Sequence, residues 1–123
     1  MAVLLLSVLA SHQTLAQSQS SGAYFLGEWS ALLTGMPDGD LPFIINFSIA
    51  EDSLQATIYD EAQTFVMPIE KVVMKGENAL SLSFYEYNSG TNVTINLLKK
   101  DEDNLTGDVL NMYSIKATRK KQP

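Results

Sequence analysis

Carboxylates and tyrosines are the residues of this chain that could do chemistry. The sequence has no cysteine, and its single histidine, His12, lies close to the N-terminus. His12 falls in a segment that we interpret below as a cleaved leader, so the mature protein would have neither histidine nor cysteine. It would then lack the parts for Ser-His-Asp or Cys-His catalysis and for thiolate or imidazole metal sites. No Gly-x-Ser-x-Gly elbow, phosphate loop or dinucleotide fingerprint occurs. We therefore expect no catalytic residue, no metal ligand and no cofactor, and predict that the protein is not an enzyme.

Most of the fourteen carboxylates fall in predicted turns, where acidic side chains mainly keep a surface soluble. Glu28 and Glu86 lie within predicted strands, and a carboxylate-only hydrolase using such a pair is the one enzymatic alternative that stays open. The acidic run at 101–104 offers oxygen ligands for Ca²⁺. However, Thr106 and Met112 stand where an EF-hand loop needs glycine and glutamate, so no calcium site is predicted.

Three tyrosines and one glutamate form the candidate ligand-binding set. Tyr85 and Tyr87 share one strand face, Glu86 lies between them in the phase of the apolar residues, and Tyr59 ends another strand. Each ring offers apolar area and a hydroxyl, and Glu86 could point into a cavity near a barrel mouth. The alternative is that the rings form half-exposed cross-strand pairs and that Glu86 is solvated at a strand end.

The charge of the chain excludes one class of partner. The net charge is −6, but Lys116, Arg119, Lys120 and Lys121 all lie in the last eight positions, and the preceding part carries fourteen acids against four lysines. Nucleic-acid-binding proteins present the opposite, a basic stripe. We expect no nucleic-acid partner, and we interpret residues 120–123 as a short basic tail.

The N-terminal segment resembles a signal peptide. Residues 1–16 contain an apolar run too short for a membrane span, and Thr14-Leu15-Ala16 provides small residues for cleavage before Gln17. No basic residue follows Met1, so the natural start could lie upstream, and a buried N-terminal helix is the alternative. Residues 17–23 read as a disordered spacer. We predict an exported protein that is periplasmic or secreted and has no stable membrane span once the leader is removed. Because it lacks cysteines and hence disulfides, we expect a bacterial source.

From Tyr24 onward the apolar residues alternate with polar ones, which is the period of β-strands. The pattern predicts an all-β domain over residues 24–119. Its eight antiparallel strands lie at about 24–33, 41–49, 54–59, 64–75, 79–87, 92–97, 105–110 and 112–119. Pro68 lacks a ladder donor and marks a bend or an edge. Short turns join the segments, which suits an up-and-down barrel or a tightly bent sandwich.

With these strands in place, the chain resembles a calycin, a relative of the lipocalin and fatty-acid-binding barrels. The resemblance rests on Gly27-Glu28-Trp29 in the first strand and on Arg119 at the end of the last. In lipocalins a Gly-x-Trp packs its indole under a basic side chain of the closing strand and seals one barrel end. The resemblance implies that Gly27, Trp29 and Arg119 close the barrel. From stacking and stem packing we then expect Arg119→Ala to destabilise the fold by about 1–2 kcal/mol.

The chain is also similar to the small β-domain that precedes some secreted bacterial α/β-hydrolases. The shared elements are Gly27-Glu28-Trp29, an apolar strand at 41–49, Leu105-Thr106-Gly107 and Thr118-Arg119. The first resemblance implies an exported, non-enzymatic barrel that binds a small apolar ligand entering opposite Trp29. The second implies the alternative, a stand-alone accessory domain with a protein partner.

Overall fold

The computed structural model describes residues 22–87 and 89–121. They form one short 3-10 helix, η1 (Ala23–Phe25), and nine strands: β1 (Gly27–Thr34), β2 (Leu41–Ala50), β3 (Ser53–Tyr59), β4 (Val66–Pro68), β5 (Lys71–Met74), β6 (Ala79–Glu86), β7 (Thr91–Asp101), β8 (Asn104–Val109) and β9 (Tyr113–Arg119). The predicted signal peptide lies outside the described residues. So does the predicted spacer, except Gly22 and Ala23, which form a turn and the start of η1.

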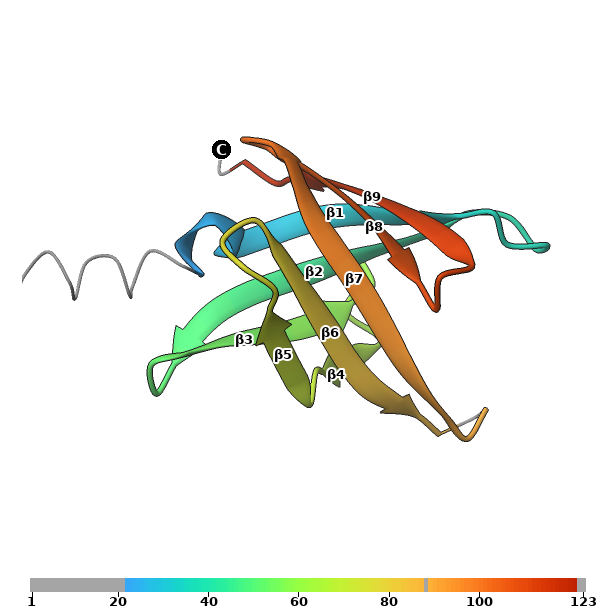
Figure 1. The fold of residues 1–123 in the computed structure, drawn as a ribbon. Helices are drawn as coiled ribbons and strands as arrows, with labels where there is room; N and C mark the ends of the chain where they lie inside the picture. The colour runs from blue at the N-terminus through green and yellow to red at the C-terminus, as the bar shows by residue number, and fades with distance from the viewer. Residues whose placement is uncertain (1–21, 88, 122–123) are drawn as a thin grey trace, which may run out of the picture.

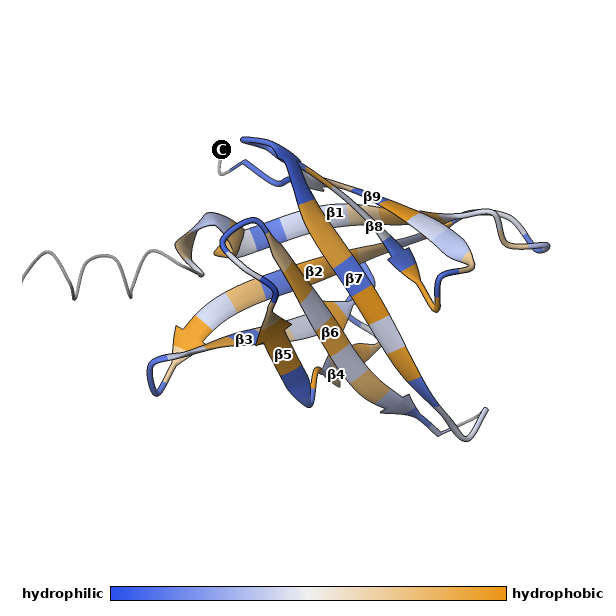
Figure 2. Cartoon of the chain, viewed as in Figure 1, coloured by the Kyte–Doolittle hydropathy of each residue, from blue (hydrophilic) through white to orange (hydrophobic). Residues whose placement is uncertain are grey.

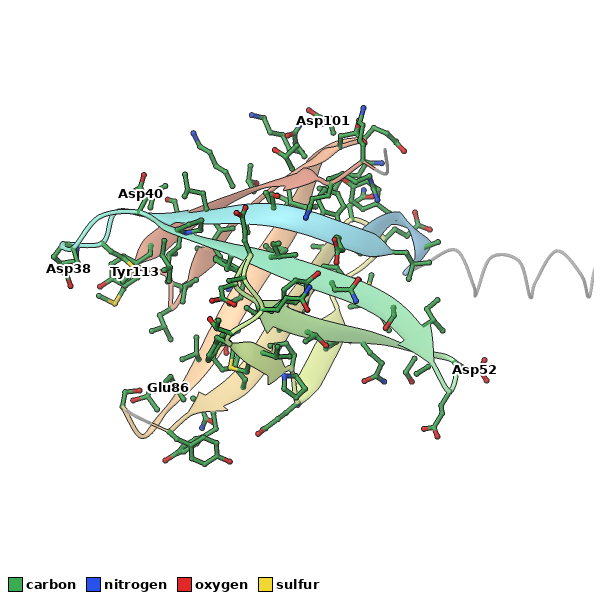
Figure 3. All side chains as sticks on the ribbon, turned by 180° about the vertical axis from the view of Figure 1, so that it is seen from behind. Asp38, Asp40, Asp52, Glu86, Asp101 and Tyr113 are labelled. Carbon is green, nitrogen blue, oxygen red and sulfur yellow. The ribbon has the colours of Figure 1, made fainter. Side chains whose placement is uncertain are left out.

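All nine strands belong to one antiparallel up-and-down sheet in the order β4-β3-β2-β1-β9-β8-β7-β6-β5. The sheet curls strongly into a half-barrel, so that β6 and β7 lie on the opposite side of the core from β1 to β3 (Figure 1). Seen from behind, β1 and β2 come to the front and β6 and β7 to the back (Figure 3). The first strand also pairs with the last, with Trp29 in register with Arg119.

The predicted count of eight strands is wrong, because the segment at 64–75 divides into β4 and β5. Pro68 has no N–H for the ladder and ends β4. The next residue, Ile69, still donates its N–H to the carbonyl of Ala56 on β3, at 3.0 Å. The chain then crosses to the far edge of the sheet, where β5 pairs with β6. The two edges of the curled sheet are therefore consecutive segments of the chain.

The alternating pattern fixes which side chains face inward. Along β7 the hydrophobic and polar bands alternate visibly (Figure 2), and Ile95 and Leu97 are buried as predicted. Strand β2 departs from the pattern at its ends, since Leu41 and Ile49 are each 50% exposed. Ile44 lies on the outer face of β2 and is nevertheless buried, beside its register partner Tyr59.

Two glycines fix the backbone where the fold needs it. Gly27 begins β1 at φ +106°, a conformation that side chains rarely adopt, and this turn separates the strand from η1. The predicted strand start at Tyr24 is therefore wrong by three residues. At Gly107 the problem is space: a Cβ there would lie 2.0 Å from the carbonyl oxygen of Asn96 on β7. The Leu105-Thr106-Gly107 segment thus needs its glycine so that β8 can approach β7.

Within residues 22–87 and 89–121, no helix has both the length and the apolar character needed to cross a membrane.

Candidate functional site

One end of the barrel is filled by aromatic side chains. Phe25 of η1 and Trp29 of β1 are fully buried, and Phe47 of β2 is 2% exposed. The Trp29 indole Nε1–H donates to the carbonyl of Phe25, at 2.9 Å, so the ring's polar atom is satisfied inside the core. We call this the closed end.

Arg119 covers the closed end from the last strand. Its guanidinium carbon lies 4.3 Å from the centroid of the Trp29 ring, a cation–π distance. The same group donates hydrogen bonds to the backbone carbonyls of Leu26 at 3.1 Å and Tyr24 at 2.9 Å, and pairs with Asp103 at 3.3 Å. Gly27, Trp29 and Arg119 therefore meet in space, with Gly27 turning the chain between η1 and the strand.

Tyr24 is a member of this closure that the sequence pattern missed. Its ring lies between two cations, with Lys99 Nζ 4.6 Å and the Arg119 guanidinium 5.2 Å from the centroid. Its hydroxyl donates to the carbonyl of Asp101. Burial, opposed by the nearby charge of Arg119, raises the pKa of Tyr24. Tyr24 and Phe25, the two aromatic residues before Gly27, gave no periodic signal, because η1 is only three residues long.

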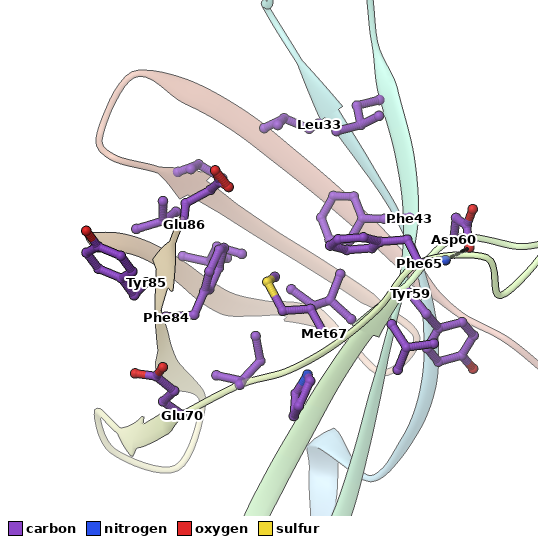
Figure 4. A pocket seen from close by; sticks show the side chains of 18 of the residues that line it. Leu33, Phe43, Tyr59, Asp60, Phe65, Met67, Glu70, Phe84, Tyr85 and Glu86 are labelled. Carbon is purple, nitrogen blue, oxygen red and sulfur yellow. Dashed lines mark hydrogen bonds between the residues drawn. The ribbon is translucent and has the colours of Figure 1, made fainter. Parts of the chain in front are cut away.

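A cavity of about 870 Å³ opens at the other end of the barrel. Phe43, Ile58 and Met67 form one wall and Phe84, Val93 and Ile95 the other. Figure 4 shows Phe43 and Phe65 facing Phe84 across this space, with Met67 between them. We call this end the mouth. Its volume falls in the range of small-molecule sites, about 300–1,000 Å³.

The cavity is confined to the mouth, because side chains fill the interior at the closed end. There, large rings fill the interior, whereas at the mouth Phe43, Met67 and Phe84 remain partly exposed. The rim is apolar and reaches into solvent: Leu41 is 50%, Phe65 53%, Val66 58% and Tyr87 82% exposed. Exposed apolar side chains grouped around a cavity are typical of binding sites.

All four predicted ligand-binding residues border this cavity, with different orientations. Glu86 is half-buried and projects inward, in phase with Phe84 (Figure 4). Tyr85 turns away from the cavity and packs edge-to-face on Tyr87, with ring centroids 4.9 Å apart. Tyr59 turns to the outer face of its strand. The structure therefore brings Tyr85, Glu86 and Tyr87 to the rim, and places the Tyr59 ring behind the wall.

The Tyr59 hydroxyl is engaged on the outer face. It donates to a carboxylate oxygen of Glu28 on β1, reaching across β2. Burial of the ring, and then this hydrogen bond, raise the pKa of Tyr59 to about 12. Glu28 also pairs with Lys120 at 3.7 Å. Since Glu28 lies on the outer face near the closed end and Glu86 at the mouth, the structure does not bring together the two acids of the hydrolase alternative.

Asp60 holds the β3–β4 loop that carries Phe65 over the cavity. Its carboxylate accepts hydrogen bonds from the Thr64 hydroxyl and, at 3.1 Å, from the Phe65 N–H. These bonds hold the pKa of Asp60 below its usual value. The loop at 101–104 is organised in the same way, because the Asp101 carboxylate accepts from the Asp103 N–H and the Asn104 amide. In the part of the chain that the structure describes, no group of three acidic or histidine side chains could hold a metal ion.

Among the cavity residues that the sequence interpretation did not assign to the site, Phe65 and Met67 come from the segment around Pro68. Phe65 and Met67 were assigned to a strand interrupted by Pro68, but not to the ligand site. Their spacing with Ile69 is the two-residue period of a strand face, and that period could have identified them.

The barrel architecture has counterparts among solved structures. No protein-family model matches the sequence, and no curated protein matches it closely enough to indicate a relative. A redesigned β-barrel is similar with a TM-score of 0.53 and 15% sequence identity, over 85% of this chain and 96% of that one. A de novo designed fluorescence-activating β-barrel is similar with a TM-score of 0.50 and 12% identity, over 82% and 98% of the two chains. At such identities the likeness shows the fold alone: this chain has the fold of a small β-barrel.

Proposed function

We propose that this protein is an exported, non-enzymatic, calycin-like barrel that binds a small apolar ligand in the cavity at the mouth. The observation that carries the proposal is the cavity itself, with about 870 Å³ between walls of Phe, Ile, Val and Met side chains. A ligand that buries ~300 Å² of apolar surface there gains roughly 7 kcal/mol, from which the cost of association is subtracted.

The closed end supports the same proposal. Because Phe25, Trp29 and Phe47 fill the interior on that side, a ligand would enter at the mouth and stop against the buried rings. The exposed rim of Leu41, Phe65, Val66 and Tyr87 would then cover the ligand's outer end. Residues facing the ligand would be Phe43, Met67, Phe84 and Val93, with Glu86 at the entrance.

A fluorescence titration tests the proposal. N-phenyl-1-naphthylamine is uncharged at neutral pH and brightens in apolar surroundings, so we expect saturable binding to the folded protein. Met67→Trp places a large ring in the cavity and should weaken this binding by at least about tenfold. Met112→Trp is the matched control, since Met112 is 71% exposed and lies outside the cavity lining.

Equal binding by the two variants would place the probe elsewhere and contradict the proposal. Absence of binding in the unmodified protein would favour the alternative, an accessory domain of the kind attached to secreted hydrolases, whose apolar rim meets a protein partner.

A further inference from the structure

The charged side chains that line the cavity are all carboxylates. Asp60, Glu70 and Glu86 come from three different segments of the sheet, and the lining contains no lysine, arginine or histidine among the described residues. The nearest basic residue in sequence, Lys71, is in register with Ser83. Ser83 alternates with the buried Leu82, so Lys71 lies on the outer face of the sheet.

Glu86 is the carboxylate that faces the cavity most directly (Figure 4). One of its oxygens accepts the Ser89 N–H at 3.1 Å, which holds the side chain at the entrance. The apolar wall beside it lowers the local dielectric and strengthens an interaction with a cation.

The loops around the mouth carry further acidic residues. Asp38 and Asp40 lie in the β1–β2 loop and Glu61 in the β3–β4 loop. Figure 3 shows Asp38, Asp40 and Glu86 on one side of the molecule and Asp52 and Asp101 on the other. At the closed end, by contrast, Lys99 and Arg119 contact Tyr24, and Lys120 and Lys121 pair with Glu28 and Asp103. A concave site lined by one sign of charge concentrates ligands of the opposite sign.

We propose that the ligand of this cavity is an apolar cation: a protonated amine on an aliphatic or aromatic body, with the body between Phe43 and Phe84 and the ammonium group at Glu86. This inference rests on the proposed ligand-binding function and narrows its ligand class. Fatty acids are then expected to be poorer ligands, because the charged side chains around the cavity, Asp60, Glu70 and Glu86, are all acidic.

The test is displacement of N-phenyl-1-naphthylamine by three compounds with one apolar chain and different charge: dodecylamine, dodecanol and dodecanoate, each as monomers at neutral pH. We expect dodecylamine to displace the probe at concentrations about tenfold lower than dodecanol, and dodecanoate to be the weakest. Raising the ionic strength should reduce the preference for the amine, since salt screens the exposed acids.

Substitutions identify the carboxylate that causes the preference for the amine. Glu86→Gln should reduce the amine preference, measured as the ratio of dodecanol to dodecylamine concentrations needed for displacement, about fivefold. Glu77→Gln makes the same charge change in the β5–β6 turn, away from the cavity lining, and should have no effect. Glu70→Gln is a second variant in the lining, in case Glu86 is needed to hold the β6–β7 turn.

The outcomes separate the two proposals. If dodecanol displaces the probe but the three compounds act equally, or dodecanoate acts best, the cation inference is overturned while apolar binding stands. If Glu77→Gln reduces the preference as much as Glu86→Gln, the preference reflects net charge and the inference is also overturned. If neither probe nor dodecanol binds, the proposed function fails together with the inference.

Discussion

Replacing Arg119 by alanine should destabilise the protein more than stacking on Trp29 alone would suggest. The side chain stacks on the buried indole, which is worth about 1 kcal/mol at a partly exposed site. It also donates two part-buried hydrogen bonds, to the carbonyls of Leu26 and Tyr24. Each costs about 1 kcal/mol when the charged donor is removed. The ion pair with Asp103 adds little, because the Asp103 side chain is 37% exposed. We therefore expect a loss of about 3 kcal/mol.

Urea unfolding followed by far-ultraviolet circular dichroism measures this loss, with fluorescence of the single Trp29 as a local probe of the closed end. Lys116→Ala is the matched control, because it removes a cation from an exposed position of the same strand and should change stability by less than about 0.5 kcal/mol. Arg119→Lys should fall between the two, since it keeps the charge and loses the planar fork. If Arg119→Ala matched Lys116→Ala, Arg119 would not hold the closed end and the reasoning would be wrong.

Two further predictions concern the strands. Gly107→Ala should cost about 3 kcal/mol of unfolding free energy or prevent folding, because the new Cβ would overlap the Asn96 carbonyl. Gly22→Ala is the control and should be close to neutral, because its Cβ would meet only Leu54, at an ordinary 3.7 Å. Equal effects of the two substitutions in unfolding experiments would refute the close approach of β8 to β7. The Tyr59 pKa of about 12 lies above the unfolded value of 10.0, so the folded state holds the phenol proton more tightly. The contribution of Tyr59 to the unfolding free energy is therefore complete below pH 10 and is lost as the pH rises toward 12. Tyr59→Phe should therefore flatten the alkaline decline in unfolding free energy and remove one late-titrating group from the tyrosinate absorbance; an unchanged titration curve would contradict the placement of Tyr59.

The closed end could be predicted from the sequence because it rests on two strong signals. Trp29 follows a glycine at the start of an alternating strand, and Arg119 ends the last strand in phase with Ile115 and Ala117. Antiparallel pairing of the first and last strands then brings the two residues into register. Tyr24 and Phe25 were misassigned because a single helical turn has too few residues to show a period.

The residues of the mouth were predicted less completely, because their positions depend on how the chain passes from one edge of the sheet to the other. Pro68 signalled a bend, but not that the chain would leave one edge of the sheet and join the other. The inward phase of Glu86 followed from alternation, whereas the Tyr59 hydroxyl on the outer face donates to Glu28, a partner two strands away. Contacts that cross a strand leave no pattern in the local sequence.

The central claim, that an apolar ligand occupies the mouth cavity, is tested most directly by methyl NMR of protein labelled at its methionine methyl groups. Met67 lines the cavity, whereas Met74 and Met112 lie outside it. On titration with dodecanol, we predict that the Met67 methyl resonance shifts in a saturable way and that those of Met74 and Met112 stay in place. Saturable shifts at Met74 or Met112 with Met67 unmoved would contradict the account.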